Sequence, residues 1–239
     1  FIDGLGGMAQ GLFATLIIGT IIQQIGLFMG GGTGDLIYEL GKIAAGLTGA
    51  GIGVGVARKL EAGHLVIVSA AVVGMIGAFA GKILSGQVLV DGNLVLAGPG
   101  EPLGAFAAAY LAIEIGILIS GKTKLDIILT PLVCIGTGSA VGLFVGPPIS
   151  EFMLWLGSLI NWGTEQQPFL MGIVVSVLMG MILTLPISSA ALGVILNLSG
   201  LAAGAATIGC CCNMIGFAVA SWRENKFSGF LAQGIGTSM

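Results

Sequence analysis

Polar side chains that could bind a small solute lie just before an apolar stretch that begins at Phe169. The turn Glu165–Gln167 directly precedes Pro168, and proline is favoured in the first turn of a helix. Carboxylate and amide groups at a helix N-terminus can hydrogen-bond the hydroxyl groups of a solute, and ordinary capping is the alternative explanation. With two glycines whose backbone could meet a ligand, the candidate solute-binding residues are Glu165, Gln166, Gln167, Ser188, Ser189, Asn197, Asn213, Gly51 and Gly53.

A single carboxylate, Glu114, lies inside the apolar stretch Leu103–Ser120. A charged side chain in the hydrocarbon core of a membrane costs about 3 kcal/mol or more, so we expect Glu114 to face the interior of a helix bundle. Two interpretations remain open. The carboxylate is either part of a proton- or substrate-linked site, or it makes a hydrogen bond that holds helices together.

The other motifs do not indicate catalysis. Three of the four cysteines are adjacent, Cys210–Cys212, and neighbouring helical residues point about 100° apart, so they cannot converge on one metal ion. The sequence has one histidine and no Ser-His-Asp, Cys-His or HExxH arrangement, which leaves little scope for hydrolytic catalysis. The stretch Gly116–Thr123 matches the phosphate-loop pattern, but its interior is Ile-Leu-Ile instead of small, flexible residues. We therefore expect no catalytic residue, no metal, no cofactor and no enzyme activity of the chain by itself.

The composition places these residues in a lipid bilayer. Of the 239 residues 56% are hydrophobic, 8% are charged and 43 are glycine, whereas roughly 25% of the residues in a soluble domain are charged. So few charges cannot cover a soluble protein of this size. The 8 basic residues against 11 acidic ones also exclude a phosphate-binding face for nucleic acid. The prediction is an all-α membrane protein, a polytopic helical bundle.

Apolar runs of helical length predict eight spans, two of them short. They cover Leu5–Met29, Ile43–Ala57, Leu65–Ala80, Leu103–Ser120, Ile127–Val145, Phe169–Leu185, Ile187–Leu198 and Leu201–Ala220. β-branched residues alternate around Asp91-Gly92-Asn93, which predicts a small β-hairpin near 86–97. Phe152–Trp162 carries tryptophans near its edges and is predicted to be an interfacial or re-entrant helix instead of a span.

The basic residues predict the orientation. When the spans alternate across the membrane, six of the eight basic residues fall on one side and the acidic excess falls on the other. The positive-inside rule then places the N-terminus and the loops with Arg58, Lys122 and Arg223 in the cytoplasm.

An internal repeat divides the chain. Gly11–Gly19 and Gly172–Gly180 both read Gly-xxx-Thr/Ser-xxx-Gly, a small-residue face that lets helices approach closely in lipid. Ala70–Gly74 is similar to Ala205–Gly209. Five predicted spans separate the copies, and this odd number predicts an inverted repeat.

A short glycine- or proline-interrupted segment lies between the two motifs of each copy. The segments are Gly49–Gly55 and Pro186–Gly193, and such matched, broken segments indicate the binding site of a secondary transporter. We expect residues 1–239 to form one transmembrane domain that is part of a ten-span, five-plus-five chain. Its first repeat covers about 5–146 and its second begins at about 168.

Five stretches carry a family resemblance: Met8–Thr20, Ser120–Pro131, Gly146–Pro148, Gln167–Gly172 and Leu183–Ala191. They resemble the enzyme IIC-like membrane proteins of the bacterial phosphotransferase system, in particular the stand-alone branch that includes the perfringolysin O regulator. The resemblance implies a sugar-permease fold in a multi-pass protein of the bacterial plasma membrane. It also implies a homodimer, cytosolic phosphotransferase components as partners, and a substrate region at 165–167 and 186–189.

The chain departs from this family pattern in two ways. Leu185–Ser189 lacks the glutamate that sugar-transporting members carry in the corresponding signature. Residues 1–239 also include no phosphoacceptor domain. Two functions therefore compete. The first is a permease for a small polar solute, such as a carbohydrate, that works by alternating access. The alternative is a membrane sensor or regulator that has the permease fold without transport activity.

Overall fold

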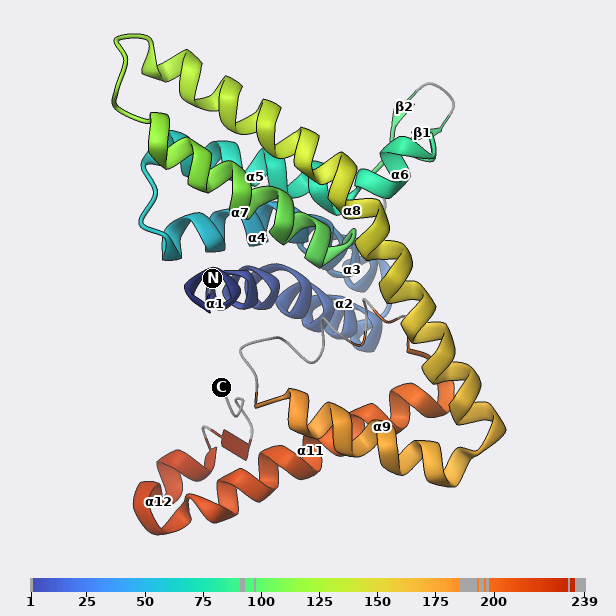
Figure 1. Ribbon diagram of the computed structural model, residues 1–239. Coiled ribbons are helices and arrows are strands. Elements are labelled where there is room, and N and C mark those ends of the chain that lie inside the picture. Colours follow the sequence, from blue (N-terminus) through green and yellow to red (C-terminus); the bar gives the residue numbers. More distant parts are fainter. Residues whose placement is uncertain are drawn as a thin grey trace. The chain divides into compact units, whose positions relative to one another are not determined.

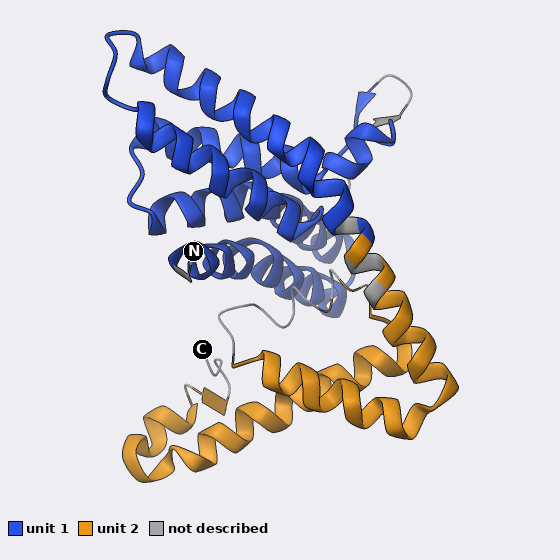
Figure 2. Cartoon of the chain, in the orientation of Figure 1, with its two compact units in different colours: residues 1–151 blue, residues 152–239 orange. Residues whose placement is uncertain are grey.

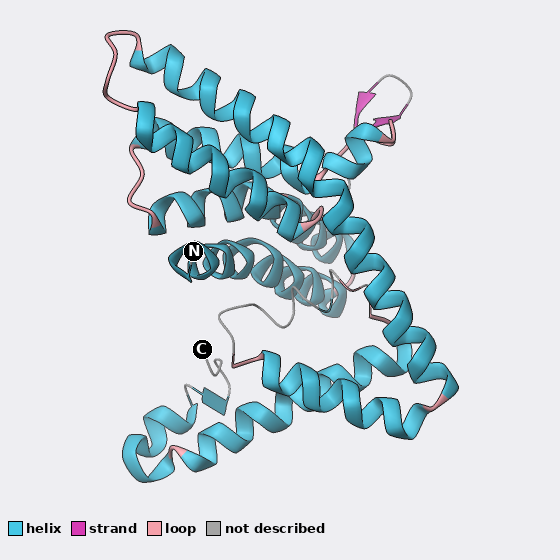
Figure 3. Ribbon diagram, viewed as in Figure 1, coloured by secondary structure: helices cyan, strands magenta, loops and turns pink. Residues whose placement is uncertain are grey.

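A computed structural model describes residues 2–90, 93–96, 98–184, 193, 196, 198–231 and 233–234. The described residues are almost entirely helical (Figure 3), which confirms the predicted all-α class. The chain divides into two compact units, Phe1–Glu151 (unit 1) and Phe152–Met239 (unit 2), which Figure 2 colours separately.

Figure 1 shows the helices in chain order. Before the β-hairpin lie α1 (Ile2–Leu12), the π-helical turn η1 (Phe13–Ile17), α2 (Ile18–Met29), α3 (Gly31–Gly46), α4 (Thr48–Lys59), α5 (His64–Ala78) and α6 (Ala80–Leu84). After it lie α7 (Pro102–Ile119), α8 (Asp126–Gln166), α9 (Pro168–Ile182), α11 (Gly200–Ala220) and α12 (Trp222–Leu231). The unit boundary falls within α8.

Several helices are long and apolar enough to cross a bilayer, so the chain is a multi-pass membrane protein. Among the described residues these are Asp3–Met29, Pro102–Ile119, Asp126–Ile149 and Gly200–Ala220. The pair α3 and α4, bent by 50°, passes the same test as one broken span, while α5 and α9 are shorter apolar helices. By length and composition, fewer than the eight predicted spans qualify.

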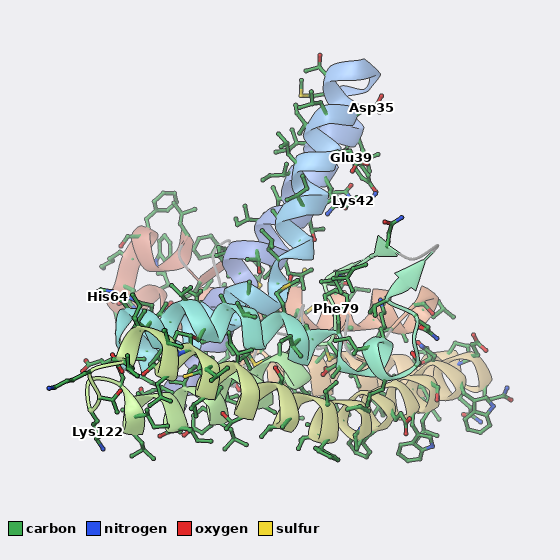
Figure 4. All side chains as sticks on the ribbon, turned by 90° about the horizontal axis from the view of Figure 1, so that it is seen from above. Asp35, Glu39, Lys42, His64, Phe79 and Lys122 are labelled. Atoms are coloured by element: carbon green, nitrogen blue, oxygen red, sulfur yellow. The ribbon has the colours of Figure 1, made fainter. Side chains whose placement is uncertain are left out.

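The second predicted span begins earlier than its apolar run. Its helix starts at Gly31, twelve residues before Ile43, so Asp35, Glu39 and Lys42 lie along α3 (Figure 4) and not in a loop. The sequence was misleading because the glycine-rich stretch 30–34 resembles a loop. Only the first two of its glycines have a positive φ and make the turn.

Other glycines of this region bring α2 and α3 together as a helical hairpin. A Cβ atom at Gly19 would collide with the backbone of Gly41, and one at Gly26 would collide with the backbone of Gly34. Figure 4 shows this hairpin extending away from the other helices of unit 1. The π-helical turn η1 packs beside the break at Leu47 that separates α3 from α4. The interruption between α1 and α2 therefore lies next to the interruption between α3 and α4.

Glycine contacts also join α1 to α4. Gly7 lies against Gly55, and Gly11 lies against Gly51, each so close that a Cβ atom would overlap the facing backbone. Residue numbers rise along α1 where they fall along α4 in these contacts, so the two helices are antiparallel. Small residues permit this close approach of helices in lipid.

The other face of α4 packs on α5 in the same manner. A Cβ atom at Gly53 would collide with the Ala70 carbonyl oxygen, and one at Gly49 would meet the Gly74 carbonyl oxygen. Helix α4 therefore lies between α1 and α5 and is antiparallel to both, which makes α1 and α5 parallel. Val73 of α5 continues the core of unit 1 by packing with Ala108 and Ala112 of α7.

Two local predictions had different outcomes. Strands β1 (Leu89–Val90) and β2 (Asn93–Leu94) pair antiparallel, which confirms the predicted hairpin. The segment Phe152–Trp162 is helical and lies beyond the candidate span Asp126–Ile149, but it continues α8, which is 41 residues long. Helix α8 contains Pro147 and Pro148, and membrane helices tolerate proline when neighbouring groups satisfy the freed carbonyls.

In unit 2 the helices α9 and α11 pack directly on each other. Ser176 meets Gly209, and four residues further on Gly180 approaches Asn213. Residue numbers rise along both helices from the first contact to the second, so α9 and α11 are parallel. Val175, Met179 and Ala206 form the buried cluster between them.

Candidate functional site

A groove lies between the first halves of α9 and α11. Its volume is about 500 Å³, within the usual range of about 300–1,000 Å³ for small-molecule sites. The residues that line this α9–α11 groove are Pro168, Phe169, Gly172, Ile173, Ser176, Val177, Gly200, Leu201, Gly204, Ala205 and Ile208. It opens where the helices diverge from their contact at Gly209, and Ser176 is the polar side chain of its lining.

The predicted polar turn Glu165–Gln167 directly precedes the groove in the chain, because Pro168 is both the next residue and part of the lining. All three side chains of the turn are exposed. Gln167 is the N-cap residue of α9, yet its side chain makes no capping hydrogen bond. None of the three side chains has a partner among the described residues, so they are free to bind a solute.

Asn213 lies further along α11, where Gly180 of α9 approaches it. Its side-chain nitrogen is buried and has no hydrogen-bond partner among the described residues, and a buried, unpaired amide costs about 1–3 kcal/mol. The residue lines a smaller cavity of about 230 Å³ with Cys212, Gly216, Phe217 and Ala220. A polar occupant of this cavity would satisfy the amide.

The structure gives Gly51 and Gly53 a packing role. Gly51 lies against Thr15 and Gly11, and Gly53 lies against Ala70, so their backbones face neighbouring helices. They lie in α4 of unit 1, whereas the polar turn and Asn213 lie in unit 2. The break expected within Gly49–Gly55 instead precedes it, at Leu47.

Glu114, for which we expect a place in the interior of a helix bundle, is exposed on the single chain, within the candidate span Pro102–Ile119. Tyr110, one helical turn earlier, donates a hydrogen bond to the Glu114 carboxylate. The ring of Tyr110 also packs beside Gly4 of α1. This hydrogen bond of Glu114 lies within α7.

A second carboxylate, Glu101, caps the N-terminus of α7. It accepts hydrogen bonds from the backbone nitrogens of Leu103, at 3.1 Å, and of Gly104. Burial raises the pKa of Glu101 above the ordinary value of a glutamate, and the two backbone hydrogen bonds oppose this rise. Glu101 therefore stabilises the start of α7 while its charge is poorly solvated.

The remaining predicted residues, Ser188, Ser189 and Asn197, lie outside the described residues. The described ranges contain no group of His, Cys, Asp or Glu that could hold a metal ion. Sequence reasoning missed the hydrogen bond from the Ser199 backbone nitrogen to Asn161 Oδ1, 3.2 Å long, which joins α8 to the start of α11. It also missed Tyr110 as the partner of Glu114, although a spacing of four residues on a helix indicates contact.

Comparison with known proteins gives one match. The family model described as "Phosphotransferase system, EIIC" matches residues 2–239, nearly the whole chain. No curated protein and no solved structure matches.

Proposed function

The chain belongs to the phosphotransferase-system EIIC family, and on this premise we propose that it is a permease that carries a small polar solute across the membrane. The solute class is carbohydrate. Family membership and apolar helices support a role as a membrane transporter component, and the solute is inferred from the polar turn.

The observation that carries the proposal is the free polar turn Glu165–Gln167. Two amides and a carboxylate supply several donors and acceptors, and a sugar offers hydroxyl groups that can pair with both kinds. These side chains are exposed and take no part in capping α9. Groups that are not used for folding are available to orient a solute at the start of the α9–α11 groove.

The groove supplies the other half of a sugar site. Its apolar lining suits the faces of a pyranose ring, while Ser176 adds one hydroxyl group. At the small residues Gly172 and Gly204, no neighbouring atom lies within 4 Å of the position that a Cβ atom would take. The backbone is therefore open to close approach by a ligand.

Transport requires a second conformation, and we assign the hinge to the paired interruptions of unit 1. The 50° bend between α3 and α4 lies beside the π-helical turn Phe13–Ile17, and π-helical turns are frequent at functional sites. In this proposal the permease works by alternating access between two inverted repeats and forms a homodimer. Its cytoplasmic face carries Arg58, Lys122 and Arg223. Cytosolic phosphotransferase components are the expected protein partners on that face.

Uptake into proteoliposomes tests the proposal, with radiolabelled glucose, mannitol and maltose as probes. Wild-type protein is expected to accumulate at least one of them. The double variant Gln166→Ala/Gln167→Ala is expected to lose about tenfold or more in uptake rate, since two hydrogen bonds of about 0.5–1.5 kcal/mol each are removed. The matched control is Gln10→Ala/Gln24→Ala, which removes two exposed glutamines of α1 and α2.

The results separate the site from the function. Unchanged uptake by Gln166→Ala/Gln167→Ala would remove the polar turn from the site. If the wild-type protein takes up none of the three sugars, the permease proposal fails for this class, and the sensor or regulator without transport is favoured.

A further inference from the structure

Two loops lie side by side at one end of unit 1. The first connects α4 to α5, and the second connects α7 to α8. A Cβ atom at Gly63 of the first loop would lie 3.5 Å from Ser120 Oγ of the second, which is ordinary van der Waals contact. In Figure 4, His64 and Lys122 mark the two loops at the same end of the helices.

Four basic residues project from this end: Arg58, Lys59, Lys122 and Lys124. We call them the basic loop pair. Their side chains are exposed and none has an ion-pair or hydrogen-bond partner among the described residues. The dipole of α4 favours cations in its last turn, which accounts for the first two but not for the two lysines of the second loop.

The two acidic residues nearby in sequence, Glu61 and Asp126, offset only part of this charge. Asp126 is engaged elsewhere, because its Oδ1 accepts hydrogen bonds from the Gly121 backbone nitrogen at 2.9 Å and from Thr130 Oγ1 at 2.6 Å. It fixes the second loop to the first turn of α8. Glu61 is the other carboxylate of the two loops, so the cations outnumber the acids two to one.

Large aliphatic side chains are exposed directly beside the basic loop pair. Leu125 follows Lys124 and is 67% exposed, and Ile127 in the first turn of α8 is 72% exposed. Leu118, near the end of α7, is 64% exposed. Apolar side chains in these positions belong in hydrocarbon, so the cations stand at the border between the acyl chains and water.

We propose that the basic loop pair binds the phosphate of an anionic phospholipid headgroup in the surrounding bilayer. Basic clusters next to membrane helices attract anionic lipids by about 1 kcal/mol per Lys or Arg. Two adjacent loops, each with two cations, can contact one phosphate from two directions. The exposed aliphatic border favours a lipid over an acidic soluble protein, because a lipid supplies acyl chains together with its charge.

Native mass spectrometry of the delipidated protein in neutral detergent tests the proposal, with dioleoylphosphatidylglycerol and dioleoylphosphatidylcholine titrated separately. The variant Lys122→Gln/Lys124→Gln is expected to bind phosphatidylglycerol about thirtyfold more weakly than the wild type. The matched control Lys42→Gln/Lys82→Gln removes the two basic residues of unit 1 outside the pair and is expected to bind as the wild type does. Binding to the wild type should also weaken when salt is raised, since exposed charges are screened.

Several outcomes would overturn the proposal. The first is equal phosphatidylglycerol affinity in the variant and the wild type. Displacement of the lipid by millimolar inorganic phosphate would assign the cations to a free anion. Binding of polyglutamate to the protein in pure phosphatidylcholine nanodiscs, lost in the lysine variant, would assign them to an acidic protein partner.

Discussion

The parallel helices α1 and α5 of unit 1 enclose a third helix, whereas the parallel helices α9 and α11 of unit 2 touch each other. In unit 1 the enclosed helix α4 contacts both neighbours through its glycines, as in the pairs Gly11–Gly51 and Gly53–Ala70. In unit 2 the open α9–α11 groove precedes the contact at Gly209 along both helices.

The difference concerns two copies of one sequence motif. Gly11 and Thr15 of the first copy lie against Gly51, but Gly172 of the second copy has no atom within 4 Å of a Cβ position, and Ser176 lines the groove. A small-residue face therefore permits close approach without determining what approaches. In unit 1 a helix occupies the face at Gly11 and Thr15, whereas in unit 2 α11 covers the face at Ser176 and Gly180 and leaves it open at Gly172.

The largest expected effect is on thermal stability, when the equivalent glycines of the two copies, Gly11 and Gly172, are each replaced by alanine. Gly11→Ala places a methyl group against the Gly51 carbonyl, and overpacking costs about 1–3 kcal/mol or more. At about 2–4 °C per kcal/mol, the midpoint of thermal unfolding should fall by about 6 °C. Gly172→Ala meets no atom and gains about 1 kcal/mol of helix propensity, so its midpoint should rise by about 2 °C.

Thermal unfolding of the detergent-solubilised protein, followed by size-exclusion chromatography after heating, gives both midpoints. Equal shifts for the two alanines would mean that Gly11 and Gly172 have similar surroundings, contrary to the comparison.

A smaller effect is expected at the helix caps, where the units also differ. Glu101 caps α7 with its side chain, whereas Gln167 leaves α9 without a side-chain cap. Serine is a favoured N-cap residue, so Gln167→Ser should add about 1 kcal/mol of stability and raise the midpoint by about 2–4 °C. The same variant should take up sugar more slowly, because it removes an amide from the polar turn. A gain in stability with wild-type uptake would contradict the role of Gln167 in the site.

The smallest effect concerns the pH dependence at Glu101. Burial raises its pKa in the folded protein above 4.5, so the folded protein holds this proton more tightly than the unfolded chain does. The resulting stability is complete below the unfolded pKa and is lost as the pH rises through the folded value. Glu101→Gln removes this titration.

The midpoint of the wild-type protein should therefore fall relative to that of Glu101→Gln as the pH is raised from 4 towards 7. Midpoints measured across this range in one detergent give the two slopes, and parallel curves would show that the Glu101 carboxylate does not contribute in this way.

Local patterns in the sequence predicted the local structure well. The polar tripeptide Asp91-Gly92-Asn93 correctly indicated the hairpin, and Pro168 correctly indicated the start of α9. Errors arose where one residue type has two uses. Glycine both makes turns and permits helix contact, which hid the start of α3.

The candidate site was predicted only in part, because its geometry depends on tertiary structure. The position of Glu165–Gln167 before a helix follows from Pro168, but the freedom of these side chains depends on what packs around them. The groove arises because α9 and α11 lie further apart before their contact at Gly209 than they do there, and no pattern along one chain reports the separation of two helices. The exposure of Glu114 likewise depends on which face of α7 its neighbours cover.

Filling the groove tests the central claim most directly. Gly204→Leu places a large side chain in the α9–α11 groove, where no atom lies within 4 Å of the Cβ position. Gly136→Leu, at an exposed glycine of α8 with equally open surroundings, is the matched control. We expect Gly204→Leu to reduce sugar uptake into proteoliposomes by about tenfold or more, a change of about 1.4 kcal/mol, with an unchanged unfolding midpoint and normal uptake by the control. Wild-type uptake by Gly204→Leu would contradict the assignment of the groove as the solute site.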